Sequence, residues 1–574
     1  MHKFFHIREE DDSMKSKVKI GAFVLAASLT LAACSSNSGD NADKNANWGT
    51  FGYDLELTRH VPFTQIKPDN LKDLGVIWSQ EFKKLNDKVP NGNQSFPIVI
   101  DGIAYVTTAE SHVFAFEATT GKVVWQWSPP QEVLDAYAKY GMPSSNRGVA
   151  VGEGKVFIIT GDNGLAAIDQ KTGKTIKLVH FSEYESMKDV TAENGYYETT
   201  APIYHDGLVF VGSSGADNGV RGFEMAFKAS DLTPAWDEPV WNVPPKGQDW
   251  LAEGLFGGGG TVWMPPAIDN ETGLMYFASA NPAPDFYGEK RPGANPNTNS
   301  IIAVEYKTGK LVWVRQQIAH DLWDYDSADS PAIITATING EKRKVVVEGN
   351  KGGLWYAFDA ATGETVYENV PFGKIDHPDP TPEGVLTYPG ILGGQNYAPD
   401  TYDPEANLVL IPGIESPTIT KTAKNEEEAA KSPDFFGIWA FGTSYAPAPE
   451  GTESYGTITA IDLNTGKQAY QIKTKDMMRG GLTSTATGIT FYGELDGHVK
   501  AIETKTGKEL WSFQTGGDSI SAAPSIFTHK GKEYIMITTG GEEPQVYVFG
   551  LGGDKTEGEA SKSYNPTANV HDSK

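Results

Sequence analysis

One short segment recurs along most of the chain and constrains its fold more than any other feature. In each copy, an alanine within a short apolar run is followed by a Thr-Gly turn, usually Thr-Gly-Lys. Glycine supplies the left-handed backbone conformation that a bulged hairpin turn requires. The turn glycines of the complete copies are Gly121, Gly173, Gly309, Gly363, Gly466 and Gly507. This recurrence predicts a fold built from one repeated hairpin unit.

Two incomplete copies extend the series. A degenerate copy runs from Ala226 to Trp236 and lacks the Thr-Gly turn, and residues 74–78 resemble the tail of an eighth copy. A unit of four short strands cannot bury its own faces, so such units stack radially on one another. The Trp or Tyr that follows most turns offers a flat face for burial between neighbouring units. We therefore expect an all-β, eight-bladed β-propeller of four-stranded antiparallel blades over residues 48–552.

Three further expectations concern how the blades are laid out. Asp-Gly turns precede the strands expected at 103–106 and 208–211. The long interval between the turns at 363 and 466 predicts a blade with a weakened turn and a long loop. Strands near 534–537 and 546–549 are expected to close the ring with N-terminal sequence.

The N-terminal segment has the pattern of an export signal. Lysines at positions 15, 17 and 19 precede an apolar run over 20–33, and two small residues lead into Cys34. This resembles a bacterial lipoprotein cleavage box, in which Cys34 is lipidated, and the run is too short for a comfortable membrane span. The alternative is a free thiol in a cleaved leader. We expect residues 1–34 to be a signal peptide whose true start is Met14, and the protein to be extracytoplasmic and lipid-anchored to the membrane.

The composition limits the partners. Residues 35–47 and 553–574 are polar without apolar periodicity, so we expect a flexible tether and a disordered tail. The formal net charge of −26 disfavours nucleic acid as a partner. Cys34 is the single cysteine, so no internal disulfide can form.

Segments that depart from the repeat carry the residues suited to chemistry. They are rich in polar side chains that a plain strand does not need, and they span 145–148, 199–202, 212–222, 257–263, 280–282 and 319–326. Among them, Asp217, Asn281, Asp324 and Asp326 offer oxygen ligands. Carboxylate and amide oxygens suit calcium or another hard cation, and the lack of a Cys or His cluster argues against zinc.

A second set of residues suits an anionic, planar ligand. Arg147, Thr199 and Ser214 offer a guanidinium fork and two hydroxyls for anionic groups. Trp263 follows four glycines at 257–260, which allow a planar ligand to approach the indole face closely. Each residue alone has an ordinary structural explanation, and it is their joint occurrence that indicates a binding site.

These segments resemble the large subunit of methanol dehydrogenase and its relatives, the PQQ-dependent quinoprotein alcohol dehydrogenases. The resemblance extends from Trp48 to about Gly541. It is carried by Gly-Ser-Ser-Gly-Ala-Asp-Asn-Gly-Val-Arg-Gly at 212–222, by Trp-Asp-Tyr-Asp at 323–326, and by the spacing of Trp263 and Asn281. It implies a propeller that holds PQQ and a metal ion near its axis and oxidises an alcohol substrate.

The resemblance also implies roles for individual residues. It places Arg147, Thr199 and Ser214, with the adjoining Gly215 and Ala216, at the PQQ carboxylates, and Trp263 beneath the PQQ ring. Asp217, Asn281 and Asp324 ligate the metal, and Asp324 is also the general base. Lys351 and Asn396 lie near the quinone oxygens. Calcium is the expected metal. Asp326 resembles an acid of lanthanide-using members, which makes a lanthanide the alternative.

The sequence departs from the family pattern at four places. A vicinal disulfide that covers PQQ in many relatives falls here at about Gly141-Met142, where there is no cysteine. An acid near the first blade is replaced near Gln94, and the metal-ligating glutamate is the shorter Asp217. A Cys-x-x-Cys-His motif is absent, so electrons are expected to pass to an external acceptor rather than to an attached haem.

Two other functions remain open at this level. One is a non-enzymatic propeller lipoprotein that acts as a scaffold, which explains the lipid and the repeats but not the site residues. The other is a degenerate quinoprotein without PQQ, which the missing disulfide and Gln94 favour. The sequence does not identify which alcohol is oxidised.

Overall fold

The computed structural model describes residues 45–251, 257–431 and 442–561. Short strands, nearly all antiparallel, are the main secondary structure of these residues, and all of them belong to one compact unit spanning Ala42–Lys574. Seven sheets have four strands each, and an eighth has five because the short strand β1 joins it in parallel. The predicted all-β propeller of four-stranded antiparallel blades is confirmed. No helix in the described ranges is both long enough and apolar enough to cross a membrane.

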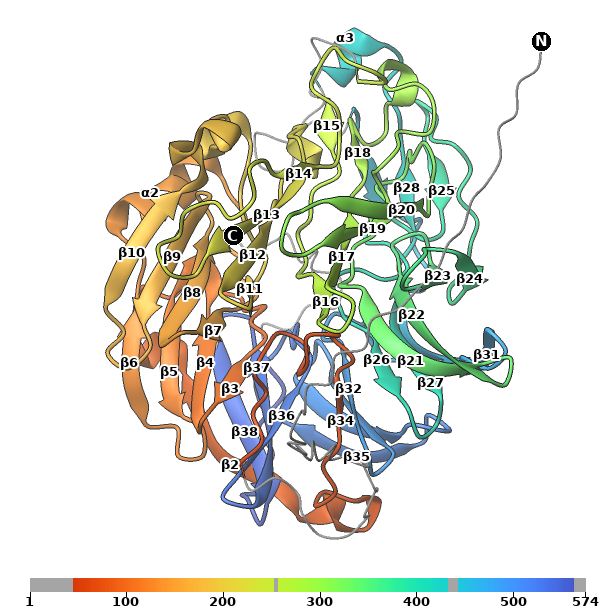
Figure 1. Cartoon of the computed structure of the whole chain (residues 1–574). Coiled ribbons are helices and arrows are strands. Elements are labelled where there is room, and N and C mark those ends of the chain that lie inside the picture. The colour runs from red at the N-terminus through yellow and green to blue at the C-terminus, as the bar shows by residue number, and fades with distance from the viewer. Residues whose placement is uncertain (1–44, 252–256, 432–441, 562–574) are drawn as a thin grey trace, which may run out of the picture. The chain divides into compact units, whose positions relative to one another are not determined.

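The sheets follow one another in chain order around a central axis (Figure 1). The first strands of neighbouring sheets contact one another, as β7 and β11, β16 and β21, and β26 and β32 do. The strands of the first four sheets are β3 (Ile98–Ile100), β4 (Ile103–Thr107), β5 (Val113–Glu117) and β6 (Val123–Trp127); β7 (Ala150–Gly152), β8 (Lys155–Thr160), β9 (Gly164–Asp169) and β10 (Thr175–His180); β11 (Ile203–His205), β12 (Leu208–Gly212), β13 (Phe223–Lys228) and β14 (Val240–Trp241); β16 (Ala267–Asp269), β17 (Leu274–Ser279), β19 (Ser300–Glu305) and β20 (Leu311–Gln316).

The other four sheets complete the circuit. Their strands are β21 (Ala332–Ile338), β22 (Glu341–Gly349), β23 (Leu354–Asp359) and β24 (Thr365–Pro371); β26 (Thr401–Asp403), β27 (Leu408–Glu415), β30 (Tyr455–Asp462) and β31 (Lys467–Thr474); β32 (Leu482–Thr485), β33 (Ile489–Gly493), β34 (His498–Glu503) and β35 (Glu509–Gln514), with β1 (His60–Val61); β36 (Ser525–His529), β37 (Lys532–Thr539), β38 (Gln545–Leu551) and β2 (Leu74–Glu81).

Smaller elements lie in the connecting loops. They are the strands β15 (Gly258–Gly259) and β18 (Pro282–Ala283), the strands β25 (Val385–Thr387), β28 (Thr418–Thr420) and β29 (Tyr445–Pro447), the helices α1 (Phe82–Leu85), α2 (Gln131–Tyr140) and α3 (Glu426–Ala429), and the 3₁₀ turns η1 (Pro68–Asp73), η2 (Ala109–Ser111), η3 (Phe181–Glu183), η4 (Glu185–Met187), η5 (Ala192–Asn194), η6 (Ala216–Asn218) and η7 (Gly288–Lys290).

The ring closes with strands from both ends of the chain. The N-terminal strand β2 pairs with β38 along its whole length, from Leu74 opposite Leu551 to Glu81 opposite Gln545. On the inner side, β3 contacts β36 of the same C-terminal sheet. Both the expected N-terminal partner and the expected closing strands are therefore confirmed.

An aromatic side chain and a turn glycine join most neighbouring sheets. Trp125 on β6 packs against Gly173, where an added Cβ would lie 2.8 Å from the indole. The indole nitrogen of Trp125 also donates to the carbonyl of Gln170 at 3.0 Å. The same arrangement joins Trp78 to Gly121, Trp236 to Gly309 and Trp313 to Gly363. Glycine is thus required twice, by its φ of about 70° and by the close approach of the indole.

The Asp-Gly turns behave as predicted. Asp101 and Gly102, which connect β3 to β4, have φ of 52° and 79°. Asp206 and Gly207, which connect β11 to β12, have φ of 47° and 77°. Two consecutive left-handed residues are the geometry of a type I′ hairpin turn.

Of the prediction for the interval between Gly363 and Gly466, the blade with a weakened turn is wrong, whereas a long insertion is present. These glycines belong to neighbouring sheets, β21–β24 and β26–β31, so no further blade separates them within the described residues. The additional residues instead form the three-stranded sheet β25–β28–β29. The interval is long because of this insertion, which an interval length alone cannot distinguish from a weakened repeat.

Parts of the predicted tether and tail contact the propeller. The Ala46 N–H donates to Thr528 Oγ1 at 2.7 Å, and Asp554 pairs through its backbone with Val76. Gly558 N–H also donates to the Gln514 carbonyl at 2.9 Å. The body of the protein therefore begins slightly before residue 48 and continues beyond 552. The signal peptide, Met14, Cys34 and residues 562–574 lie outside the described residues.

Candidate active site

The candidate site is built by loops that share one end of the ring. Consecutive strands alternate in direction, so loops after the second strand of a sheet and loops after the fourth strand end at the same side. Asn281 and Lys351 follow second strands, β17 and β22, whereas Trp263 and Asp324 precede the first strands β16 and β21. Residues from distant repeats therefore meet near the axis.

The residues predicted to bind an anion form one cluster. Arg147 is 5 % exposed, and its Nη1 donates to Thr199 Oγ1 at 2.5 Å and to the Thr199 carbonyl at 3.3 Å. Ser214 Oγ lies 3.2 Å from Thr199 Oγ1. The guanidinium carbon of Arg147 lies 5.0 Å from the ring centre of Trp263. Burial lowers the pKa of Arg147 to about 10, so it remains charged at neutral pH.

The residues predicted to bind a metal form a second cluster. Asp217 and Asp324 are joined by Asp285, and one carboxylate oxygen of each lies within 4.8 Å of the others. The Asn281 side-chain amide donates to Asp285 Oδ1 at 2.8 Å. Asn281 Oδ1 and Asp285 Oδ2 are buried and accept no hydrogen bond from any described residue. Converging oxygens without donors are what a hard cation requires.

One buried lysine faces this cluster. Lys351 Nζ lies 2.7 Å from Asp324 Oδ1 and 3.0 Å from Asp326 Oδ2. The backbone N–H of Asn281 donates to Asp326 Oδ1 at 2.8 Å. Both oxygens of Asp326 are thus engaged, and Asp326 lies beside the three-carboxylate group rather than within it.

The clustered carboxylates have shifted pKa values. Burial, followed by the charge of Asp326, raises the pKa of Asp217 to about 7. Burial also raises the pKa of Asp324 and of Asp285 well above the ordinary range, and Lys351 opposes both shifts. One ammonium does not balance four carboxylates, so the site has the electrostatic character of a cation site.

The loop that carries Asp324 is held by Asp321. Asp321 accepts hydrogen bonds from the backbone N–H groups of Trp323 at 2.8 Å and Tyr325 at 2.7 Å. Asp324 lies between these two residues with φ of 63°. Aspartate tolerates this left-handed conformation better than most residues do, and the strain is typical of functional sites.

A single loop connects the two clusters. Ser214 lies in the anion-binding cluster, and Asp217 lies three residues later in η6, which Gly215 precedes and Ala216 begins. The Ser214 N–H donates to the Tyr197 carbonyl at 3.2 Å. Tyr197 is buried, and its pKa is raised by burial and then by the charge of Asp217. The two clusters are therefore parts of one site.

Asn396 differs from the other predicted residues, because both polar groups of its side chain bond to the backbone of its own loop. Its side-chain amide donates to the Leu392 carbonyl at 3.0 Å, and its Oδ1 accepts the Tyr397 N–H at 3.0 Å. Its loop reaches Lys351, whose carbonyl accepts the Gly394 N–H at 2.6 Å. Asn396 thus shapes the loop next to Lys351.

Three residues of the site were not predicted from the sequence. Asp285 lies four positions after Asn281 on the same loop, and this spacing was the available signal. Tyr397 has its ring centre 6.3 Å from that of Trp263. Arg479 has its guanidinium carbon 4.7 Å from the ring centre of Tyr397. The Arg479-Gly480 pair repeats Arg147-Gly148 at the same distance before a first strand.

The sequence departs from the family pattern at two residues near the expected cofactor, Met142 and Gln94, and both are buried. Met142 packs in an apolar cluster with Tyr137, Tyr197 and Phe286, against helix α2. Gln94 is 9 % exposed, and its Oε1 has no hydrogen-bond donor among the described residues.

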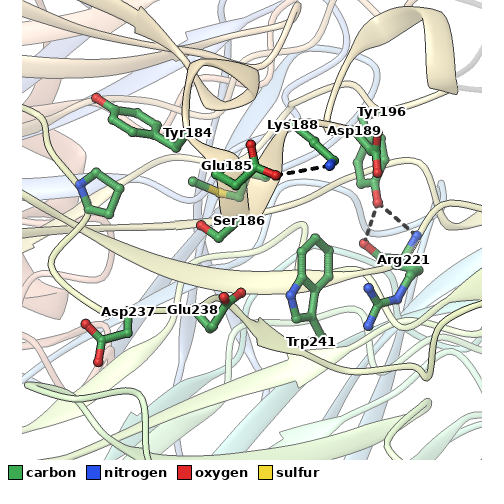
Figure 2. A pocket seen from close by; sticks show the side chains of 12 residues that line it. Tyr184, Glu185, Ser186, Lys188, Asp189, Tyr196, Arg221, Asp237, Glu238 and Trp241 are labelled. Carbon is green, nitrogen blue, oxygen red and sulfur yellow. Dashed lines mark hydrogen bonds and ion pairs between the residues drawn. The ribbon is translucent and has the colours of Figure 1, made fainter.

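A separate pocket lies at the edge of the sheet β11–β14 (Figure 2). It has a volume of about 680 Å³, and its lining includes Tyr184, Tyr196, Arg221 and Trp241 but none of the predicted site residues. The Arg221 guanidinium lies 4.4 Å from the ring centre of Trp241 and donates to the Val243 carbonyl. This pocket is therefore separate from the loop cluster described above.

Comparison with known proteins agrees with this fold. Residues 48–373 and 368–535 match the PQQ family described as "Glucose/ethanol/alcohol dehydrogenase, beta-propeller domain". The fold and this match define a quinoprotein-type propeller, and the chain belongs to this family of PQQ-dependent dehydrogenases.

Individual relatives extend over most of the chain. Quinohemoprotein alcohol dehydrogenase of Comamonas testosteroni is 29 % identical over 559 residues, covering 90 % of this chain and 75 % of the relative. The 1-butanol dehydrogenase (cytochrome c) of Thauera butanivorans is 30 % identical, covering 86 % and 74 %. The crystal structure of the Comamonas testosteroni enzyme superposes with a TM-score of 0.78 at 26 % identity, covering 91 % and 82 %.

Proposed function

We propose that this protein is a PQQ- and metal-dependent dehydrogenase that oxidises an alcohol by hydride transfer and passes the electrons to a separate carrier. One observation carries the proposal: the carboxylates of Asp217, Asp285 and Asp324 converge within 4.8 Å on the same loop system that holds the Arg147 cluster. A hard-cation site beside an anion site suits a cofactor that is both polyanionic and metal-bound.

The residues present fit PQQ. Arg147 keeps a buried Nε without an acceptor in the described ranges, and Thr199 and Ser214 present hydroxyls beside it. These three would hold carboxylates, with the backbone of Gly215 and Ala216 adjoining them. Trp263 would support the planar ring, and Lys351 and the Asn396 loop would lie at its quinone edge.

The metal would be held by Asp217, Asn281 and Asp324, with Asp285 as an additional ligand. Four carboxylates, counting Asp326, face the single ammonium of Lys351. A divalent cation leaves part of this negative charge uncompensated, whereas a trivalent cation compensates more of it. Calcium suits the oxygen ligands, and the fourth acid strengthens the case for a lanthanide. Metal titration of the apoprotein distinguishes them.

Asp324 is the general base in this proposal. When bound, PQQ supplies the hydride acceptor for the substrate carbon. Asp324 accepts the proton of the alcohol hydroxyl, and Lys351, 2.7 Å from Asp324 Oδ1, orients the carboxylate. A base with a raised pKa is matched to proton transfer near neutral pH. Burial of the site excludes water from the reacting groups.

The cellular arrangement is part of the same proposal. The lipoprotein-like sequence around Cys34 supports an extracytoplasmic protein anchored to the membrane by lipid. Electrons leave to an external acceptor, since the sequence has no Cys-x-x-Cys-His motif. Mass spectrometry of the mature N-terminus tests the anchor: an acylated cysteine at position 34 supports it, and an unmodified N-terminus contradicts it.

The activity is tested with purified protein loaded with PQQ and either calcium or a lanthanide. Dye-linked oxidation of a panel of primary and secondary alcohols is then measured. Turnover that requires both PQQ and metal supports the proposal. A protein that binds PQQ without turnover is a degenerate quinoprotein, and one that binds neither PQQ nor metal is better explained as a scaffold.

A further inference from the structure

Two buried arginines approach the same aromatic ring. The guanidinium carbon of Arg147 lies 4.5 Å from the ring centre of Tyr397, and that of Arg479 lies 4.7 Å from it. Arg147 is 5 % exposed and Arg479 is 3 % exposed. The two cations are close enough that the charge of Arg479 contributes to lowering the pKa of Arg147, after burial.

Neither arginine has an anionic partner in the described part of the chain. Arg147 and Arg479 form no ion pair with a described residue. Nε and Nη1 of Arg479 and Nε of Arg147 are buried without an acceptor there. Asp476, three positions before Arg479, is itself buried, and its Oδ2 has no hydrogen-bond donor among the described residues.

The favourable contact with Tyr397 does not offset the free-energy cost of burying two cations. A cation–π contact contributes about 0.5–2 kcal/mol. Burying an unpaired charge costs several kcal/mol. The arrangement is therefore strained in the free protein, and an anionic ligand with more than one negative group would relieve it.

The repeat places the two arginines equivalently. Arg147 and Arg479 both begin an Arg-Gly pair, three positions before the first strands β7 and β32 of their sheets. Both therefore enter the site from the same end of the ring, and they reach it from different sheets. Tyr397, four positions before β26, lies against both guanidinium groups.

We propose that Arg479 is a second carboxylate-binding residue for the cofactor and acts together with Arg147. The two planar forks would each bind a separate carboxylate, which a single arginine cannot do. The inference rests on the proposed function and identifies the residues that would hold PQQ where a covering disulfide is absent.

The test compares the affinity of the full-length protein for PQQ in Arg479 variants. PQQ binding to the metal-loaded protein is measured by equilibrium titration of tryptophan fluorescence. Loss of a charge-assisted fork in Arg479→Met weakens binding by about 20- to 100-fold. Arg479→Lys retains the charge without the fork and gives an intermediate affinity. The matched control is Arg315→Met, because Arg315 on β20 donates to Gly363 and Val314 carbonyls outside the site.

Thermal unfolding separates a binding role from a structural one. Removing one of two unpaired buried cations is expected to raise the melting temperature of the apoprotein while reducing the additional stabilisation by PQQ. A structural arginine would do the opposite in the apoprotein. If the native protein binds PQQ and Arg479→Met binds it equally well, the role of Arg479 is refuted and the proposed function stands. If the native protein does not bind PQQ, both fail.

Discussion

Lys351 Nζ lies 2.7 Å from Oδ1 of Asp324, and both side chains are at least nine-tenths buried. The ammonium also contacts Asp326 at 3.0 Å. Burial favours the neutral form of Asp324, whereas the nearby positive charge favours the carboxylate. Lys351 therefore counteracts part of the effect of burial on the pKa of the candidate base and fixes its orientation.

Replacing Lys351 with methionine should reduce kcat. The substitution leaves Asp324 without its cation, so the pKa of Asp324 rises further and less of the base is ionised at neutral pH. We expect a loss of about 100-fold in kcat and a shift of the acidic limb of the pH–rate profile to higher pH. Steady-state assays with saturating PQQ, metal and dye measure both effects. Lys344→Met is the control, since Lys344 pairs with Asp269 and Glu271 away from the site. Equal kcat in the two variants would refute the role of Lys351.

Glu224 should be a destabilising residue. Its side chain is fully buried, and neither carboxyl oxygen has a hydrogen-bond partner among the described residues. The position two before the repeat alanine is apolar in all six complete copies: Val113, Leu165, Ile301, Trp355, Ile458 and Val499. Glu224→Leu is therefore expected to increase the free energy of unfolding at neutral pH by about 2 kcal/mol.

The effect of Glu224 should depend on pH. Burial raises its pKa well above the ordinary 4.5, so the folded protein retains a proton that the unfolded chain releases. The stability that this protonated side chain contributes to the free energy of unfolding is fully present below pH 4.5. That stability is lost as the pH rises toward the pKa of Glu224 in the folded protein. Urea unfolding across this range should show a smaller decline for Glu224→Leu than for the native protein. Parallel pH profiles would contradict the assignment.

The contact between Trp125 and Gly173 gives a test of how the sheets are joined. Gly173 and Gly154 have nearly the same φ, 70° and 72°, but an added Cβ meets Trp125 at 2.8 Å only at Gly173. Alanine at Gly154 is expected to cost about 1 kcal/mol of conformational strain. Alanine at Gly173 is expected to cost about 3 kcal/mol, since overpacking adds to the strain. Urea unfolding of both variants measures the difference, and equal losses would show that the indole contact contributes little.

More of the fold than of the candidate site could be predicted from the sequence. The turn glycines and the aromatic residues four positions later reveal the sheets, because each hairpin is local in sequence and recurs along the chain. The interval from 363 to 466 was misread, since an inserted sheet and a weakened repeat lengthen the chain alike. Asp285 and Arg479 are ordinary loop residues until folding brings them to the axis, and only the three-dimensional arrangement reveals their partners.

The base assignment is the central claim, and one measurement tests it most directly. Asp324→Asn is loaded with PQQ and metal, and the change in bound PQQ absorbance is followed after mixing with alcohol but without an electron acceptor. The account predicts that the variant binds PQQ and keeps its melting temperature, while alcohol-dependent reduction slows by about 1,000-fold or more. Reduction at the native rate in the folded, PQQ-loaded variant would contradict it.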